Sequence, residues 1–294
     1  MKRTIRAVTV ALAAALLLAA APAARAQVVT ENAGVISPET PLLRESVSHF
    51  EAENLREVRL GNQFILGLDP TRELKLTVPF LWREAEFPGA DGREAREGLF
   101  GLGDISLRFK QSLFQEDDVM ESTRFAALAE LRAPTGDDDE TEAGVEIPRR
   151  LQLGTGDFGF GGGAVFTLIR DRHRFSTEAL FRHRTRHEGA RLGQTVDWNA
   201  AYWYRLLPAR FDAETTLEVR GVLEVLATYR FASDLADRRD DDDGLIVWLA
   251  PGIQIYPSRS LLFEANVEVP VYQDLDDSLG DRRFAASVIV KVLF

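Results

Sequence analysis

Charged side chains recur at alternate positions along residues 174–187. The charged parity holds Arg174, Glu178, Arg182, Arg184 and Arg186, and the other parity holds Phe175, Thr177, Ala179 and Phe181. Successive side chains of a β-strand point to opposite faces, so we predict one ionic face and one apolar face here. Inside an enclosed lumen, an ionic face would either orient a polar or anionic solute between opposite charges or form ion pairs that fill the interior. Both interpretations stay open at this point.

Metal chemistry is a poor fit to the histidines and acidic runs. His183 and His187 are four residues apart, which on a strand separates them by about 13 Å. Two zinc bonds of ~2.1 Å cannot span that gap. The acidic runs at 137–140 and 240–243 lack the spaced ligands and fixed glycine of a calcium loop. We therefore predict no metal site, surface histidines near a loop, and solvated acidic loop tips.

The glycine-rich stretch GTGDFGFGGG, residues 154–163, does not match a phosphate-binding loop. It lacks the Gly-Lys-Ser/Thr ending, and no helical pattern follows it. We interpret its glycines as sites of a sharp bend or of close backbone approach in a sheet. None of the four histidines stands in a nucleophile motif, so we predict no catalytic residue and no cofactor.

The same alternation continues through most of the chain. The last stretch, RRFAASVIVKVLF, has Phe284, Val288, Val290 and Phe294 on one uniformly apolar parity. We predict about twelve strands, at 43–53, 57–68, 72–86, 99–114, 123–134, 152–169, 174–187, 194–207, 214–232, 244–256, 260–273 and 282–294. Many exceed the usual ~5–6 residues of globular strands and reach the ~9–11 residues that a membrane strand requires.

These strands predict an antiparallel transmembrane β-barrel with apolar side chains outside and charges inside. Short connectors at 69–71, 171–173 and 257–259, and a looser one near 208–212, alternate with long polar loops. The last strand must pair with the first, so that no edge stays open. Aromatic residues near strand ends are expected to face lipid as an interfacial girdle, namely Trp82, Tyr202, Tyr204, Tyr229, Phe231 and Tyr256.

The first 26 residues have the pattern of a cleavable secretory signal, with a basic head, an Ala/Leu/Val run and Ala24-Arg25-Ala26 before Gln27. We predict a signal at 1–26 and a barrel domain at 27–294. Cleavage removes four of the 35 basic residues and leaves 31 against 46 acidic residues, a formal net charge of −15. This balance argues against nucleic acid as a partner. The chain has no cysteine, so no disulfide holds it together.

Three stretches resemble the outer-membrane barrel family labelled "MetA-pathway of phenol degradation", a group of transporter-like barrels. They are GLGDISLRFKQSLF (101–114), AALAELRAPTGDDDE (126–140) and LQLGTGDFGFGGGAVF (151–166), within a match that is firmest over 99–207. The resemblance implies passage of small, including aromatic, compounds through the outer membrane, and it brings no catalytic residues. The final Phe294 is similar to the sorting signal that the barrel-assembly machinery reads.

We therefore predict a barrel in the cell outer membrane for passive, selective passage of small molecules, aromatic or hydrophobic ones included. The alternatives are a closed structural or surface-interaction barrel and, less favoured, a lipid-modifying enzyme. Expected partners are outer-membrane lipid, lipopolysaccharide, a small solute and the assembly machinery. The predicted lumen residues are Lys75, Asp104, Arg108, Glu130, Arg132, Glu178, Arg182, Arg184, Asp197, Glu218, Arg220, Glu224, Glu264, Glu268 and Lys291.

Overall fold

Long antiparallel strands form the wall of the molecule in the computed structural model, which describes residues 30–88, 94–142, 145–210, 216–235, 238–239, 242–276 and 280–294. The wall strands are β1 (Leu42–Ala52), β2 (Leu55–Asp69), β3 (Arg72–Pro88), β4 (Glu94–Leu102), β5 (Ile105–Asp118), β6 (Glu121–Ala133), β9 (Gly159–Arg170), β10 (His173–Arg184), β12 (Thr195–Leu207), β13 (Glu218–Arg230), β16 (Gly244–Ser258), β17 (Leu261–Leu275) and β18 (Arg282–Leu293). Among the described residues, none forms a helix long and apolar enough to cross a membrane.

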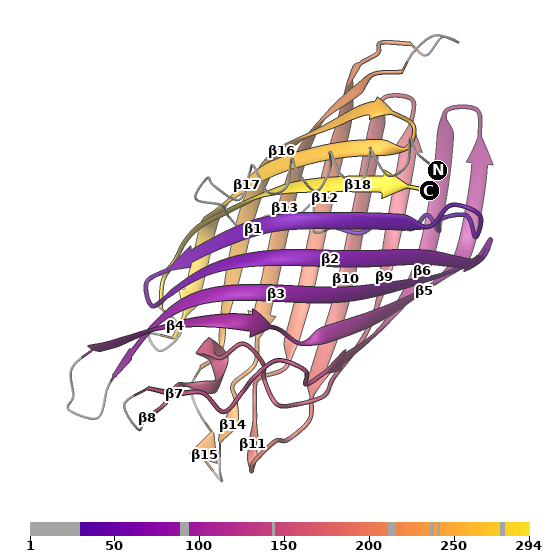
Figure 1. The fold of residues 1–294 in the computed structure, drawn as a ribbon. Helices are drawn as coiled ribbons and strands as arrows, with labels where there is room; N and C mark the ends of the chain where they lie inside the picture. Colours follow the sequence, from indigo (N-terminus) through magenta and orange to yellow (C-terminus); the bar gives the residue numbers. More distant parts are fainter. Residues whose placement is uncertain are drawn as a thin grey trace, which may run out of the picture.

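The first and last strands pair and close the sheet (Figure 1). Their register runs from Leu42 opposite Leu293 to Ala52 opposite Arg282. β3 pairs with β5 at one end and with β4 at the other, so these two consecutive strands share one wall position. The thirteen strands of the sheet therefore make twelve wall positions, and each strand is antiparallel to its neighbours. This confirms the predicted closed barrel of twelve antiparallel strands.

The exposed fractions of the side chains show the predicted inside-out arrangement. On β10, Glu178 is 4 % exposed, while Phe181 on the other face is 42 % exposed. The same alternation holds along most of β18, where Ala285, Ser287 and Ile289 are buried and Phe284 is exposed, although the outward Val290 is also buried. Because apolar side chains cover the outside and charges are buried inside, the wall is built as a transmembrane barrel.

The two ends of the barrel differ in the length of their connectors. Two-residue turns join β2 to β3, β5 to β6, β9 to β10 and β16 to β17. At the opposite end the long connectors carry β7 (Thr141–Glu142), β8 (Val145–Glu146), a 3-10 turn at Arg149–Leu151, β11 (Ala190–Arg191), β14 (Asp234–Leu235) and β15 (Arg238–Arg239). Figure 1 shows these short strands gathered at the end away from the C-terminus. We call the two ends the turn end and the loop end.

The predicted strand limits need three corrections. Residues 152–158 are not part of a strand, because the chain from Pro148 makes a 3-10 turn and an irregular loop before β9 begins at Gly159. Residues 185–187 likewise lie beyond the end of β10. The single strand predicted at 99–114 is interrupted between Leu102 and Ile105. Close backbone approach at the glycines is present at Gly163, where an added Cβ would lie 2.1 Å from the carbonyl oxygen of Ala179.

The girdle prediction holds for the exposed rings of Trp82, Tyr202, Tyr229 and Phe231, and Tyr204 shares the outward parity of Tyr202. It is wrong for Tyr256. This residue has the parity of the buried Gln254, and its hydroxyl donates to Gln254 Oε1 at 3.3 Å. The guanidinium of Arg220 lies 4.9 Å from the Tyr256 ring centroid, so the ring belongs to the lumen.

Candidate functional site in the lumen

A segment that precedes the first strand lies inside the barrel. The backbone N–H of Thr30 donates to Glu224 Oε1 on β13 at 3.0 Å, and that of Glu31 donates to Glu178 Oε2 on β10 at 3.3 Å. Further along, Ile36 N–H donates to Glu73 Oε2 on β3 at 3.0 Å. Because β10 and β13 lie far from β3 in the strand order, residues 30–36 cross the lumen from wall to wall. We call residues 30–41 the N-terminal strap.

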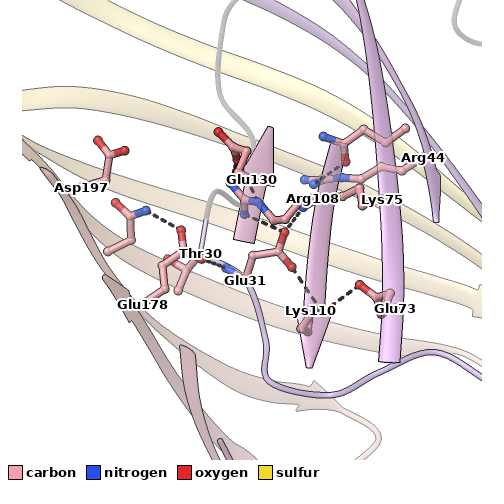
Figure 2. Close-up of polar contacts among 12 residues, drawn as sticks. Thr30, Glu31, Arg44, Glu73, Lys75, Arg108, Lys110, Glu130, Glu178 and Asp197 are labelled. Atoms are coloured by element: carbon pink, nitrogen blue, oxygen red, sulfur yellow. Dashed lines mark hydrogen bonds and ion pairs between the residues drawn. The ribbon is translucent and has the colours of Figure 1, made fainter. Parts of the chain in front are cut away.

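Glu31 is the ionic centre of the strap (Figure 2). Its carboxylate accepts a hydrogen bond from Arg108 Nη1 at 3.1 Å, pairs with Lys75, and lies 3.5 Å from Lys110 Nζ. Lys110 also donates to the carbonyl oxygen of Gly34 at 3.0 Å and pairs with Glu73 at 2.9 Å. Three cations from β3 and β5 therefore hold one carboxylate of the strap, which makes the contact strongly dependent on a single charge.

The wall is shaped to receive the strap at Gly67. An added Cβ on this residue would lie 2.2 Å from the carbonyl oxygen of Ile36, and within 2.8 Å of backbone atoms of Ser37 and Pro38. A side chain at position 67 would meet backbone rather than a movable side chain. The lack of a Cβ on β2 therefore allows the strap to pack directly on the wall.

A chain of ion pairs follows the wall beside the strap. Arg108 Nη2 lies 2.6 Å from Glu130 Oε2, and Glu130 Oε1 lies 2.8 Å from Arg182 Nε. Arg182 also pairs with Asp197, whose other oxygen accepts a hydrogen bond from Thr228 at 2.6 Å. The chain joins β5, β6, β10 and β12, and it places charges of both signs along one side of the lumen.

A second ionic cluster surrounds Glu264 on β17. One of its oxygens lies 3.6 Å from Arg44 Nη2. The other lies 3.3 Å from Lys291 Nζ and accepts a hydrogen bond from Gln254 at 2.6 Å. These partners come from the first and last strands and from β16, so the cluster joins the wall where the barrel closes.

The loop-end half of the lumen holds a large apolar cluster beside the buried ion pairs of Glu57 with Arg83 and of Asp157 with Arg184. Buried side chains from the wall form a cluster with three residues of the β6–β9 connector, Ile147, Leu151 and Leu153. The wall contributes Phe50, Ala52, Leu55, Leu81, Ala85, Phe87, Leu99, Leu226, Ile246, Trp248, Ala250 and Ala285. The connector therefore packs into the lumen at the loop end, while the strap crosses it nearer the turn end.

Asp104 attaches this connector to the wall. Its Oδ1 accepts from the backbone N–H of Thr135 at 3.3 Å and of Gly136 at 3.2 Å. Its Oδ2 accepts from the hydroxyl of Thr155 at 2.7 Å. Asp104 lies in the interruption between β4 and β5, so the break in the wall is also the anchor of the connector that packs into the loop end.

The structure places the predicted lumen residues on the inner side of the wall. Lys75, Arg108, Glu178 and Glu224 contact the strap, while Glu130, Arg182 and Asp197 form the adjacent chain of ion pairs. Glu264 pairs with Lys291, Arg184 pairs with Asp157 at 3.3 Å, and Arg220 pairs with Glu218 at 2.6 Å. Arg132 lies beside Arg182 and Arg184 around a small cavity, and Glu268 is buried. Whether they line a solute path stays a prediction, as does the sorting role of Phe294.

Sequence reasoning missed the strap, the partners Glu73 and Lys110, and the apolar cluster. The strap has no periodic pattern, so its position could not be predicted from alternation. Glu73 and Lys110 did carry a signal, since each has the parity of a predicted lumen residue two positions away. The apolar cluster was missed because we expected only polar side chains to point inward.

The histidines lie where the sequence suggested. His183 is on β10 with the outward parity, and His187 lies in the next loop with its Nε2 3.1 Å from Asp138 Oδ2. Within the described part of the chain, no group of three or more metal-ligating side chains is present. The acidic run 240–243 and the signal at 1–26 lie wholly or partly outside the described residues.

Comparison with known proteins gives a fold. No family model matches the chain, and no curated protein sequence matches it. The COG4313 outer membrane channel from Pseudomonas putida F1 superposes with a TM-score of 0.68 and 10 % identity, over 91 % of this chain and 100 % of that one. The likeness is one of fold. The NanC porin (TM-score 0.43, 8 % identity, 86 % and 99 % of the two chains) and the β domain of the Bordetella autotransporter BrkA (0.45, 10 %, 87 % and 99 %) are more distant.

The phenol-degradation family named by the sequence resemblance is therefore not matched as such. The coarser statement, an outer-membrane β-barrel fold, is shown.

Proposed function

We propose that this chain is a channel of the cell outer membrane that passes small molecules selectively and that the N-terminal strap closes. The observation that carries the proposal is that the lumen is crossed by a segment outside the wall, held by one carboxylate among three cations. Ion pairs of wall residues alone would make a permanent filling. A strap held by noncovalent contacts can leave while all twelve wall positions stay paired.

The two halves of the lumen suggest the class of solute. A molecule from the loop end meets the apolar cluster around Phe50 and Trp248, with the ion pair of Glu57 and Arg83 beside it, and then the charged region around Glu31. Aromatic or hydrophobic molecules with a polar group suit this sequence of surroundings, since rings pack on apolar side chains and the polar group pairs with fixed charges. The family resemblance also favours small aromatic compounds as the solute.

Conductance in a planar lipid bilayer tests the proposal. We expect the wild-type protein to be closed most of the time, and Glu31→Gln to raise the open fraction at least severalfold, because the three cations lose their common anion. The matched control is Glu39→Gln, which removes the same charge from an exposed position of the strap. Equal conductance of the wild type, Glu31→Gln and a variant lacking residues 30–36 would contradict the proposal.

A closed structural barrel is the second candidate, and the many internal ion pairs are the observation that favours it. A closed barrel predicts that none of these variants conducts ions in the planar bilayer, although each folds and inserts. Swelling of vesicles that contain the strap-deletion variant, in solutions of small aromatic alcohols or sugars, then distinguishes a path from a filled lumen.

A further inference from the structure

The outward face of β1 differs from the rest of the lipid-facing wall. Its outward residues are Leu43, Glu45, Val47, His49 and Glu51, so charged or polar side chains alternate with apolar ones. The neighbouring outward face of β18 is apolar at the same depth, at Val288, Val290 and Val292. Polar groups that face the hydrocarbon are costly, and in membrane proteins they usually mark a functional contact.

Glu45 is the most unusual member of this face. It lies three residues from the turn-side end of β1, which is about 8 Å along the membrane normal for a strand tilted by ~40°. Its cross-strand neighbours are Val290 on β18 and Asn62 on β2. Within the described part of the chain, the carboxyl group of Glu45 has no hydrogen bond and no ion pair, although its backbone pairs in the sheet.

Asn62 is the second polar group at this depth. Toward the turn end, the same face of β2 continues with three exposed apolar residues, Phe64, Leu66 and Leu68. Asn62 therefore lies within the apolar band and not at its edge. Its Nδ2 donates to the carbonyl oxygen of Val78 at 3.0 Å. One N–H and the carbonyl oxygen of the Asn62 amide are left for another partner.

A carboxyl group beside a carboxamide is a self-complementary pair. The carboxyl can donate one hydrogen bond to the amide oxygen and accept one from the amide N–H. Glu45 and Asn62 lie side by side on adjacent strands. A two-fold axis that is parallel to the membrane normal and passes between them would bring the Glu45 of one copy opposite the Asn62 of the other copy. Lipid tails offer no such partner, and headgroups lie beyond Phe64, Leu66 and Leu68.

We propose that the outward face of β1 and β2 binds a second copy of this chain, with Glu45 paired to the partner subunit's Asn62 and Asn62 paired to the partner subunit's Glu45. The contact is isologous, which is the commonest form of a homodimer. Around it, Leu43, Val47, Leu60 and Phe64 supply apolar packing. This inference concerns the outside of the wall and does not depend on whether the lumen conducts.

Disulfide cross-linking in intact membranes tests the proposal, because the chain has no cysteine of its own. Glu45→Cys and Asn62→Cys chains with different affinity tags are produced together and oxidised mildly. We expect a disulfide-linked species of two chains that carries both tags. The matched control is Ala179→Cys on β10, an exposed outward position six wall positions away, which should give no dimer.

A second measurement leaves the wall free of cysteine. In mild detergent we expect the wild-type protein to have the mass of two chains, and Glu45→Leu to weaken dimerisation about tenfold, as for loss of polar contacts between membrane segments. Heat-dependent migration on a gel verifies that each variant is folded. Monomeric wild-type protein, or cross-linking of Glu45→Cys only to a protein of another mass, would overturn the proposal.

Discussion

Glu264 shows how individual charges stabilise the inner wall. It is 2 % exposed, and its two oxygens meet Arg44, Lys291 and Gln254. Parity along β17 predicted that Glu264 faces the lumen, and parity along β18 predicted the same for Lys291. The partners could not be predicted, because pairing across the wall depends on the register of β16, β17, β18 and β1, which no single strand contains. For the same reason Glu31, which lies in no strand, was not recognised as the centre of a cationic site.

Replacement of Glu264 by Gln should remove the anion that pairs with Lys291 and lies beside Arg44. We expect the free energy of unfolding to fall by about 3 kcal/mol, the usual result of removing one partner of a buried ion pair. Urea unfolding in lipid vesicles measures it. In the double variant Glu264→Gln/Lys291→Met part of the loss should be recovered. The control is Arg170→Gln, whose pair with Glu121 is exposed and should contribute under ~1 kcal/mol; equal losses in both variants would contradict the role of burial.

At the scale of elements, alternation predicted the wall strands well and the segments between them poorly. β1 was the strand with the weakest signal, and its outward face explains why, since Glu45, His49 and Glu51 interrupt the apolar parity. Residues 152–158 carried a strand-like parity but form a connector, because Leu151 and Leu153 pack into the apolar cluster instead of continuing the wall. The strap contacts the wall through its backbone, through Glu31 and through the buried Ala33, and these contacts leave no periodic pattern in the sequence.

Gly67→Ala tests the packing of the strap on β2. The added methyl group would overlap the backbone at Ile36, so the strap must move away from the wall. We expect a rise in the open fraction of single channels, in the same direction as for Glu31→Gln, with the barrel still folded. Gly162→Ala is the control, because an added Cβ there has no atom within 4 Å. If Gly67→Ala conducts like the wild type while Gly162→Ala does not, the strap is not what closes the lumen.

At the scale of the whole molecule, the barrel is stable only if lipid covers its apolar exterior. Val267 is an outward residue near the middle of β17, and it is 47 % exposed on the isolated barrel. Val267→Arg should therefore lower the free energy of unfolding in lipid vesicles by about 2–4 kcal/mol. The same change at Val119, in the turn between β5 and β6, should have little effect, since that side chain lies outside the wall strands. A smaller loss at Val267 than at Val119 would mean that the outer face does not meet lipid.

The outward polar side chains of β1 and β2, among them Glu45 and Asn62, form a stripe on one side of the barrel. This polar stripe also limits how many copies of the chain can associate. The described wall carries charged or polar side chains at mid-depth on this one side, whereas the opposite side, around β10, presents phenylalanine, threonine and alanine. A contact that uses the stripe of both molecules leaves neither with a second stripe to offer. Such barrels would form discrete pairs that diffuse separately in the bilayer, and they would not grow into the two-dimensional lattices or rows that head-to-tail contacts produce.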